Sequence, residues 1–456
     1  MAWSDCAALA AFGDVTTLAG SGAAGSADGT GAAASFKSPE GVTVDAAGNV
    51  FVADSGNNTI RRITLAGVVT TFAGSGAGGS ADAQGAAASF RVPVGMATDA
   101  TGTMFVADYF NNTVRRISST GAVTTLAGSG LPGSTDATGI AASFDRPAGV
   151  AVDGSGTVYV ADSNNNKIRT INTAGVVATL AGSGATGFVN ATGTAAAFNR
   201  PSALTLDSAG NVFVCDFFNH VIRKITPAGV VSTFAGSGAN ATTDGTGLAA
   251  AFVNPSGITT APSGTMYVAD RNGYVIRQIT SAGVVTSLAG GSGGTTTDGN
   301  GASASFNAPQ AIAADAFGHL YVTEDNGNVV RRIDIGAPGA PATTTTTIAA
   351  TTTTTIAATT TTTIAATTTT TGAPAPAAVG TATPPPVIVA PAPTAVPPSA
   401  TPTAATPAAT TTTQAVGGTK PATTTITRST TTPVAVAPSA IAAPAMAVTG
   451  PVAYAG

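Results

Sequence analysis

The chain has 456 residues and a formal net charge of −4, and only 9% of its residues are charged. The segment after residue 336 contains Lys420 and Arg428 and no carboxylate, so the repeats before it carry a net charge of −6. A mildly acidic region whose arginines recur at one repeat position forms no basic stripe. This argues against a nucleic acid or an anionic membrane surface as the partner.

Two cysteines, Cys6 and Cys215, are too few for a disulfide framework, and neither belongs to a CxxC pair that would bind zinc. We expect Cys215 to be a small buried side chain. The first residues lack the basic start of a signal peptide, and no stretch is apolar for long enough to cross a bilayer. We therefore expect no inserted membrane segment.

Residues 39–74 describe the unit from which most of the chain is built. They read PEGVTVDAAGNVFVADSGNNTIRRITLAGVVTTFAG, with four alternating apolar segments separated by Gly, Asn and Asp. This pattern predicts four antiparallel strands. The unit recurs in six copies spaced by 54 residues, marked by Phe36, Phe90, Phe144, Phe198, Phe252 and Phe306. A four-stranded repeat of this length predicts an all-β, six-bladed propeller.

The two ends of the repeat region complement each other. The sixth copy stops after its third strand, and the chain begins with an extra fourth strand at residues 15–20. Placing that strand in the last blade would close the ring and leave no open gap between the first and last blades. We therefore expect an N-terminal extension at residues 1–14, a propeller at 15–335 and a tail at 336–456.

The recurring segments P-x-G-V-x-V-D, G-N-V-F-V-A-D and N-N-x-I-R-R-I resemble the NHL repeat over residues 15–333. More distantly, the chain resembles the six-bladed propellers of the SMP-30/gluconolactonase type. The resemblance implies a propeller, but NHL domains bind proteins or RNA, act as sensors or, in relatives, catalyse reactions. It therefore predicts the architecture and leaves the activity open.

Some residues recur in every blade and are expected to be structural. Asp54 and its equivalents end the second strand, and Arg61 and its equivalents lie on the third, so we expect buried ion pairs that fix the strand register. Asp28 and its equivalents lie in the interblade loops. Each of these either caps a short helical turn or belongs to a row of calcium sites.

Residues that differ between blades are the candidates for function. The turn after the second strand carries aromatic pairs in blades 2 and 4, where other blades carry Ser, Asn or Asp. Their rings either form an exposed anchor for a partner or fold under the neighbouring loops. The candidate binding residues are Tyr109, Phe110, Phe217, Phe218, His220, Arg271 and Tyr274.

A second candidate site lies at the mouth of the central channel. Glu40 and Gln310 begin the innermost strands of two blades that become neighbours when the ring closes. Lactonase-type propellers hold a calcium ion in this channel with a Glu, so the resemblance implies a metal-dependent lactonase or lyase as the alternative function. His220 and His319 have no Ser or Cys partner that would indicate a catalytic triad.

We therefore expect a non-catalytic propeller without a cofactor, acting as a monomer that binds a protein or a glycan through the face formed by the interblade loops and second turns. The tail is rich in Thr, Pro and Ala and is expected to be disordered. It reads either as an O-glycosylated stalk, which favours an extracellular or cell-surface location, or as an intracellular linker.

Overall fold

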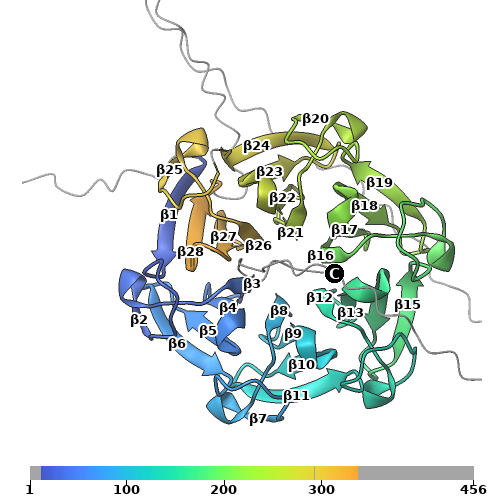
Figure 1. The fold of residues 1–456 in the computed structure, drawn as a ribbon, viewed down its shortest axis with the longest axis horizontal. Helices are drawn as coiled ribbons and strands as arrows, with labels where there is room; N and C mark the ends of the chain where they lie inside the picture. The colour runs from blue at the N-terminus through green and yellow to red at the C-terminus, as the bar shows by residue number, and fades with distance from the viewer. Residues whose placement is uncertain (1–11, 292, 337–456) are drawn as a thin grey trace, which may run out of the picture. The chain divides into compact units, whose positions relative to one another are not determined.

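The computed structural model describes residues 12–291 and 293–336, and Figure 1 shows them as a ring of blades around a central axis. These residues form six antiparallel sheets, each with four principal strands. The predicted all-β, six-bladed propeller is confirmed. The predicted disordered tail lies outside the described residues.

The strands of each blade run in order from the axis to the rim (Figure 1). The inner strands are β3 (Pro39–Val44), β8 (Pro93–Thr98), β12 (Pro147–Val152), β16 (Pro201–Leu206), β21 (Pro255–Thr260) and β26 (Pro309–Ala314). The second strands are β4 (Val50–Asp54), β9 (Met104–Asp108), β13 (Val158–Asp162), β17 (Val212–Asp216), β22 (Met266–Asp270) and β27 (His319–Glu324). The third strands are β5 (Thr59–Ile63), β10 (Thr113–Ile117), β14 (Lys167–Ile171), β18 (Val221–Ile225), β23 (Val275–Ile279) and β28 (Val329–Asp334).

The outer strands are β6 (Val68–Ala73), β11 (Ala122–Ala127), β15 (Val177–Ala181), β19 (Val231–Ala235), β24 (Val284–Gly290) and β1 (Asp14–Ala19). Four two-residue strands from the interblade loops pair outside them: β2 (Gly29–Thr30), β7 (Ala83–Gln84), β20 (Gly245–Thr246) and β25 (Gly299–Asn300). The described helices are all short 3₁₀ turns. None of them is long and apolar enough to span a membrane.

The N-terminal strand closes the ring. β1 pairs antiparallel with β28, so that Val15 lies opposite Ile333 and Thr17 opposite Arg331. The Thr17 hydroxyl also donates a hydrogen bond to Asp298 at 2.9 Å. The expected closure is confirmed, and the last blade is built from both ends of the propeller sequence.

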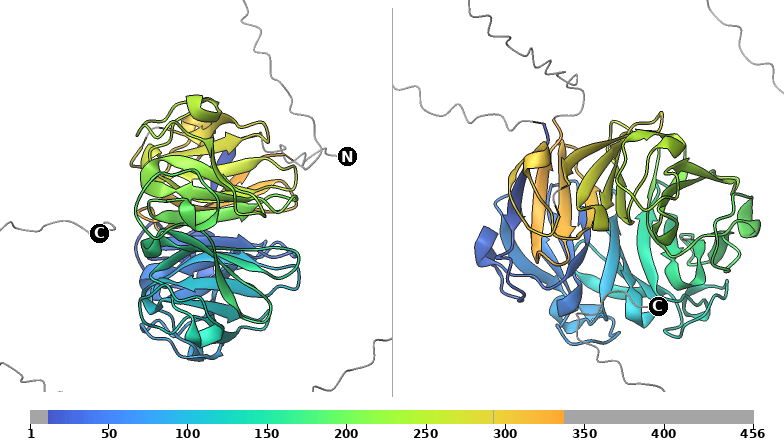
Figure 2. Two further views of the ribbon diagram at one scale, coloured as in Figure 1. Left: turned by 90° about the vertical axis from the view of Figure 1, so that its right-hand side faces the viewer. Right: turned by 45° about the horizontal axis from the view of Figure 1, so that its top comes forward.

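The apolar core lies between neighbouring blades. One cluster joins Phe51 and Ile60 of the first blade to Phe90 and Met104 of the second. Because a blade is a single sheet, both of its faces must be covered by its neighbours, which explains why the ring has to close. Two views in Figure 2 show the blades packed face to face around the ring.

A buried arginine holds each blade together. In the first blade, Arg61 Nη1 lies 2.8 Å from Asp54 and Nη2 lies 2.7 Å from Asp28. Arg61 and Asp54 are completely buried. Both carboxylates compensate the charge of the guanidinium, and the pair links the second and third strands to the interblade loop. The expected buried ion pairs are confirmed.

The expected capping role of Asp28 is wrong. The 3₁₀ helix η1 (Gly31–Ala33) has Thr30 at its N-cap, without a capping side-chain hydrogen bond. Asp28 instead accepts hydrogen bonds from Arg61 and from the backbone and hydroxyl of Thr71. These partners are distant in sequence, so the local pattern did not reveal them. Among the described residues, no group of three or more His, Cys, Asp or Glu side chains could hold a metal ion, which leaves the calcium alternative without support.

Candidate functional site

The candidate site lies on the face formed by the interblade loops and by the turns between second and third strands, which we call the second-turn face. Five second turns contain a 3₁₀ helix: η2 (Ser55–Asn57), η4 (Tyr109–Asn111), η6 (Ser163–Asn165), η8 (Phe217–Asn219) and η10 (Arg271–Gly273). The residue that ends each second turn has a left-handed backbone, with φ between 50° and 58°. These residues are Asn58, Asn112, Asn166, His220, Tyr274 and Asn328.

The two aromatic pairs are divided between surface and interior. Phe110 and Phe218 are 42% and 40% exposed, whereas Tyr109 is 3% exposed and Phe217 is half-buried. Within each pair the rings meet edge to face, with centroids 5.1 Å and 4.9 Å apart. The two alternatives for these rings therefore both occur: one ring of each pair is exposed, and the other packs beneath it.

Guanidinium groups lie against the aromatic rings. Arg146 is 5.3 Å from the centroid of Phe110 and 5.9 Å from that of Tyr109. The guanidinium of Arg91 also lies 5.9 Å from the centroid of the Phe110 ring. That of Arg200 lies 5.9 Å from the centroid of Phe218. These distances are typical of cation–π contacts.

Tyr109 connects three blades at the channel mouth. Arg200 Nη2 donates a hydrogen bond to the Tyr109 hydroxyl at 3.1 Å, and the Tyr109 ring packs with Val94 and Ala148. Burial raises the pKa of Tyr109, although the positive charges of Arg200 and Arg146 act in the opposite direction. The phenol is therefore neutral at physiological pH, and it tethers Arg200 without cancelling its charge.

The second turns also position the arginines of the next blade. Asn112 Oδ1 accepts a hydrogen bond from the backbone N–H of Arg146, and Asn166 Oδ1 accepts one from that of Arg200, each at 2.9 Å. Arg146 and Arg200 have φ of 51° and 53°, a conformation that side-chain-bearing residues seldom adopt. The asparagines therefore hold two arginines in a backbone geometry that would otherwise be unfavourable.

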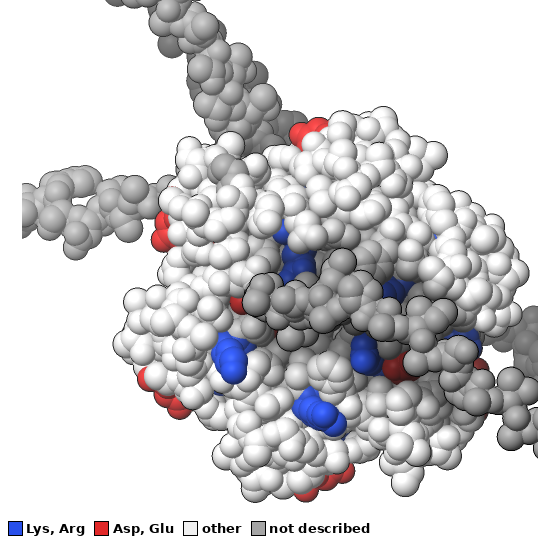
Figure 3. All heavy atoms as spheres, viewed as in Figure 1, with Lys and Arg blue, Asp and Glu red and all other residues white. Residues whose placement is uncertain are grey.

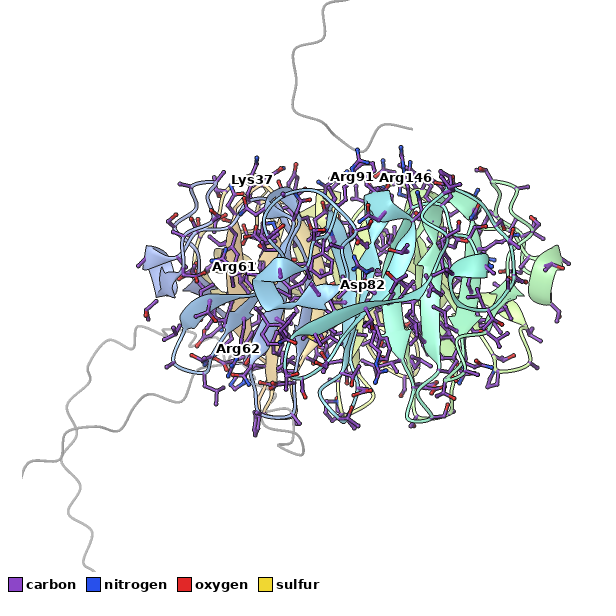
Figure 4. The ribbon with its side chains drawn as sticks, turned by 90° about the horizontal axis from the view of Figure 1, so that it is seen from below. Lys37, Arg61, Arg62, Asp82, Arg91 and Arg146 are labelled. Atoms are coloured by element: carbon purple, nitrogen blue, oxygen red, sulfur yellow. The ribbon has the colours of Figure 1, made fainter. Side chains whose placement is uncertain are left out.

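Positive charge gathers on this face around the axis (Figure 3). Lys37, Arg91 and Arg146 lie on this face (Figure 4), and Arg200 belongs with them because its Nη2 donates a hydrogen bond to the Tyr109 hydroxyl; we call these four residues the basic arc. Figure 4 places Lys37, Arg91 and Arg146 on one face and Arg62 towards the other. Within the described parts of the chain, no member of the basic arc forms an ion pair with a carboxylate.

The expectation that no basic stripe exists is therefore wrong for this face. The four cations are at least 54 residues apart in the sequence, and each precedes the inner strand of a different blade. The rotational symmetry of the ring brings them together. The signal was present in the sequence, because four of the six Phe-x-x-Pro segments that precede the inner strands contain Lys or Arg.

The remaining predicted binding residues lie in blades 4 and 5. Arg271 forms an ion pair with Asp325 at 2.6 Å, so its charge is compensated. His220 Nδ1 faces the backbone carbonyl of Val253, and Tyr274 is half-buried. The charge of Arg271 is thus matched by a carboxylate, unlike the charges of the basic arc.

The donor groups at the channel mouth do not fit a calcium ion. Glu40, which is 7% exposed, supplies a single carboxylate. The neighbouring inner strand supplies Gln310, whose Oε1 is buried and has no hydrogen-bond partner among the described residues. The hydroxyl groups of Ser202 and Ser256 donate to backbone carbonyls instead. Calcium requires six to eight oxygen ligands, and a single carboxylate beside the basic arc does not provide such a site.

The inner strands line a cavity of about 300 Å³ in the channel. Its lining residues are aliphatic, Gly, Met and Thr, and none of those among the described residues is ionisable. Thr43 and Thr98 are joined by a hydrogen bond of 3.1 Å, as are Thr205 and Thr260. The cavity wall therefore provides no group for general acid–base chemistry.

The repeat sequence matches a known family. The family model described as NHL repeat matches residues 36–63 and 144–171, which lie in the first and third blades. The chain contains NHL repeats. The predicted resemblance is confirmed at the blade motifs that suggested it.

Curated relatives share parts of this NHL-repeat propeller. Protein SUPPRESSOR OF QUENCHING 1, chloroplastic, of Arabidopsis thaliana is 27% identical over 269 residues, which cover 54% of this chain and 25% of that protein. Human NHL repeat-containing protein 2 is 34% identical over 186 residues, which cover 37% of this chain and 26% of that protein. The chain thus spans about a quarter of the length of each.

Solved structures show the same fold. A structural genomics protein of unknown function from Bacteroides thetaiotaomicron aligns with a TM-score of 0.57 and 23% identity, covering 70% of this chain and 75% of its own. An auxiliary nutrient binding protein from Bacteroides thetaiotaomicron aligns with a TM-score of 0.54 and 16% identity, covering 70% of this chain and 75% of its own. Likeness at these identities shows the fold alone.

Proposed function

We propose that this NHL-repeat propeller is a non-catalytic binding module that captures a protein or a glycan through its second-turn face. The observation that carries the proposal is the exposure of Phe110 and Phe218 at a turn position where the other four blades carry Gly or Asn. Neither ring is needed to complete a blade, because four blades lack it. Exposed aromatic rings beside arginine are the residue types that most often anchor a partner.

The test replaces these rings in the full chain. Phe110→Ser combined with Phe218→Ser should reduce binding to the ligands that the unmodified protein selects from peptide and glycan arrays. The matched control is Leu65→Ser with Phe317→Ser, two exposed apolar residues in the turns between β5 and β6 and between β26 and β27, which emerge on the opposite face. Thermal unfolding of both variants checks that the propeller remains folded.

Loss of binding in the first variant but not in the control supports the proposal. Equal binding by both variants, or an unmodified protein that selects no ligand, would contradict it. Sedimentation velocity of the same samples tests the accompanying proposal that the module acts as a monomer.

A further inference from the structure

We propose that the partner of the second-turn face is a protein that presents an acidic segment, whose carboxylates bind the basic arc. This inference rests on the proposed function and specifies the chemistry of its ligand. It starts from the continuous contact between Arg91, Phe110, Arg146, Tyr109 and Arg200 described above.

Among the described residues no carboxylate forms an ion pair with this cluster, although the buried Glu40 lies near enough to act electrostatically on Tyr109. The buried Arg61, for comparison, has two carboxylates within 2.8 Å, whereas Arg91, Arg146 and Arg200 have none. The nearby Asp145 accepts a hydrogen bond from the Asn164 side chain at 3.2 Å. Neighbouring guanidinium groups repel each other, so a bound anion would relieve an unfavourable interaction already present in the free protein.

Contacts with aromatic rings also restrain the arginines before a ligand arrives. A guanidinium stacked on an aromatic face keeps its N–H groups directed outwards in its own plane. The contacts of Arg146 with two rings and of Arg200 with Tyr109 and Phe218 restrict both side chains before a ligand arrives. Binding then costs less side-chain entropy, and each guanidinium can accept a bidentate carboxylate.

The charge elsewhere on the propeller favours a short acidic segment over a long polyanion. The repeat region carries a net charge of −6, and the rim aspartates Asp28, Asp82 and Asp244 have side chains that are 46% to 51% exposed. A nucleic acid crossing the face would meet this negative rim. The chain's own segment after residue 336 contains no Asp or Glu, so it lacks the charge that the arc selects.

The experiment measures binding of the full chain to three probes: an alternating Glu-Gly peptide, the matching Gln-Gly peptide and an oligo(U) RNA. We expect the Glu peptide to bind and the Gln peptide to bind far more weakly, with affinity for the Glu peptide falling as the salt concentration is raised. Arg146→Gln with Arg200→Gln should weaken Glu-peptide binding by roughly tenfold or more.

The matched control is Arg62→Gln with Arg116→Gln. It removes the same charge from exposed or half-exposed third-strand positions that lie outside the basic arc. We expect it to change the affinity by less than about twofold, because distant exposed charges are screened by salt. Equal effects of the two variants would overturn the inference, and so would binding of oligo(U) in preference to the Glu peptide.

A selection from a random peptide library separates this inference from the proposed function. Enrichment of Asp and Glu, lost in the Arg146→Gln, Arg200→Gln variant, supports the inference. Neutral peptides whose binding depends on Phe110 and Phe218 but not on the arginines would overturn it and leave the proposed function standing. Binding that depends on neither set of residues would overturn both.

Discussion

The side-chain oxygen of Asn112 accepts a hydrogen bond from the backbone N–H of Arg146 at 2.9 Å, across the boundary between two blades. Asn58 makes the equivalent bond to Val92 at 2.9 Å, one blade earlier. The same structural device therefore holds a cation in one blade and an apolar residue in another. This difference provides a matched pair for separating stability from ligand binding.

We predict that Asn112→Ala and Asn58→Ala each lower the free energy of unfolding by about 1–3 kcal/mol, because each leaves a backbone N–H without its partner. Only Asn112→Ala should also weaken binding of the Glu-Gly peptide, since it releases Arg146. Chemical denaturation and peptide titration measure the two effects. Equal loss of peptide affinity in both variants would show that Asn112 acts through stability alone.

If β1 closes the ring, substitutions on its buried face should lower the free energy of unfolding far more than substitutions on its exposed face. Val15 is 1% exposed and lies opposite Ile333, whereas Thr16 on the same strand is exposed. Val15→Asp buries an unpaired carboxylate and should lower the free energy of unfolding by about 3 kcal/mol or more. Thr16→Asp should change it by less than about 0.5 kcal/mol. Similar melting temperatures for the two variants would argue against closure by this strand.

The packing of the inner strands predicts that replacing Gly41 and Gly154 by alanine affects stability differently. A Cβ atom on Gly41 would lie 1.8 Å from the carbonyl oxygen of Val94, whereas one on Gly154 would meet no atom within 4 Å. Gly41→Ala should therefore destabilise the propeller by about 1–3 kcal/mol or more. Gly154→Ala should leave stability unchanged or raise it by up to about 1 kcal/mol. Urea denaturation of both variants tests this, and a neutral Gly41→Ala would contradict the close approach of the two strands.

The buried carboxyl groups predict an unusual dependence of stability on pH. Burial raises the pKa of Asp162 to about 6, although hydrogen bonds from Asn165 and the backbone of Asp145 and the charge of Arg169 act in the opposite direction. The pKa in the unfolded chain is about 3.9, so this group contributes stability that is complete below about pH 4 and is lost as the pH rises through about 6. Burial likewise raises the pKa of Asp54, Asp108, Asp216, Asp270 and Glu324.

We therefore predict that the melting temperature does not fall between pH 7.5 and about pH 5, and that Asp162→Asn reduces the slope of melting temperature against pH in this range. Differential scanning calorimetry at several pH values gives the slope directly. A slope that is unchanged in Asp162→Asn would mean that this carboxyl does not titrate as predicted.

The repeats made the fold predictable, and their number and spacing determined the blades, the closing strand and the face on which the second turns lie. Comparison of the copies also identified Phe110 and Phe218 as residues that no blade requires. The burial of Tyr109 was not predictable in this way, because it depends on Val94 and Ala148 in two blades. A comparison of equivalent positions in the six copies shows which residues differ, but it does not show which residues of different copies touch.

The basic arc was missed for a related reason. Net charge describes the whole chain, and it was negative, whereas Arg91 and Arg146 are brought together by the geometry of the ring. The role of Asp28 was also misassigned, because its partner Arg61 lies 33 residues away. Both errors concern side-chain contacts between distant segments, which the local sequence pattern does not specify.

If the second-turn face is the binding surface, a bound ligand must lie against it, and cross-linking can show where the ligand lies. A peptide selected by the full chain can carry a photoreactive diazirine, and mass spectrometry can locate the cross-linked residues. The account predicts cross-links in the segments around Phe110, Arg146 and Phe218. Cross-links concentrated around Arg62 and Arg116 instead would contradict it.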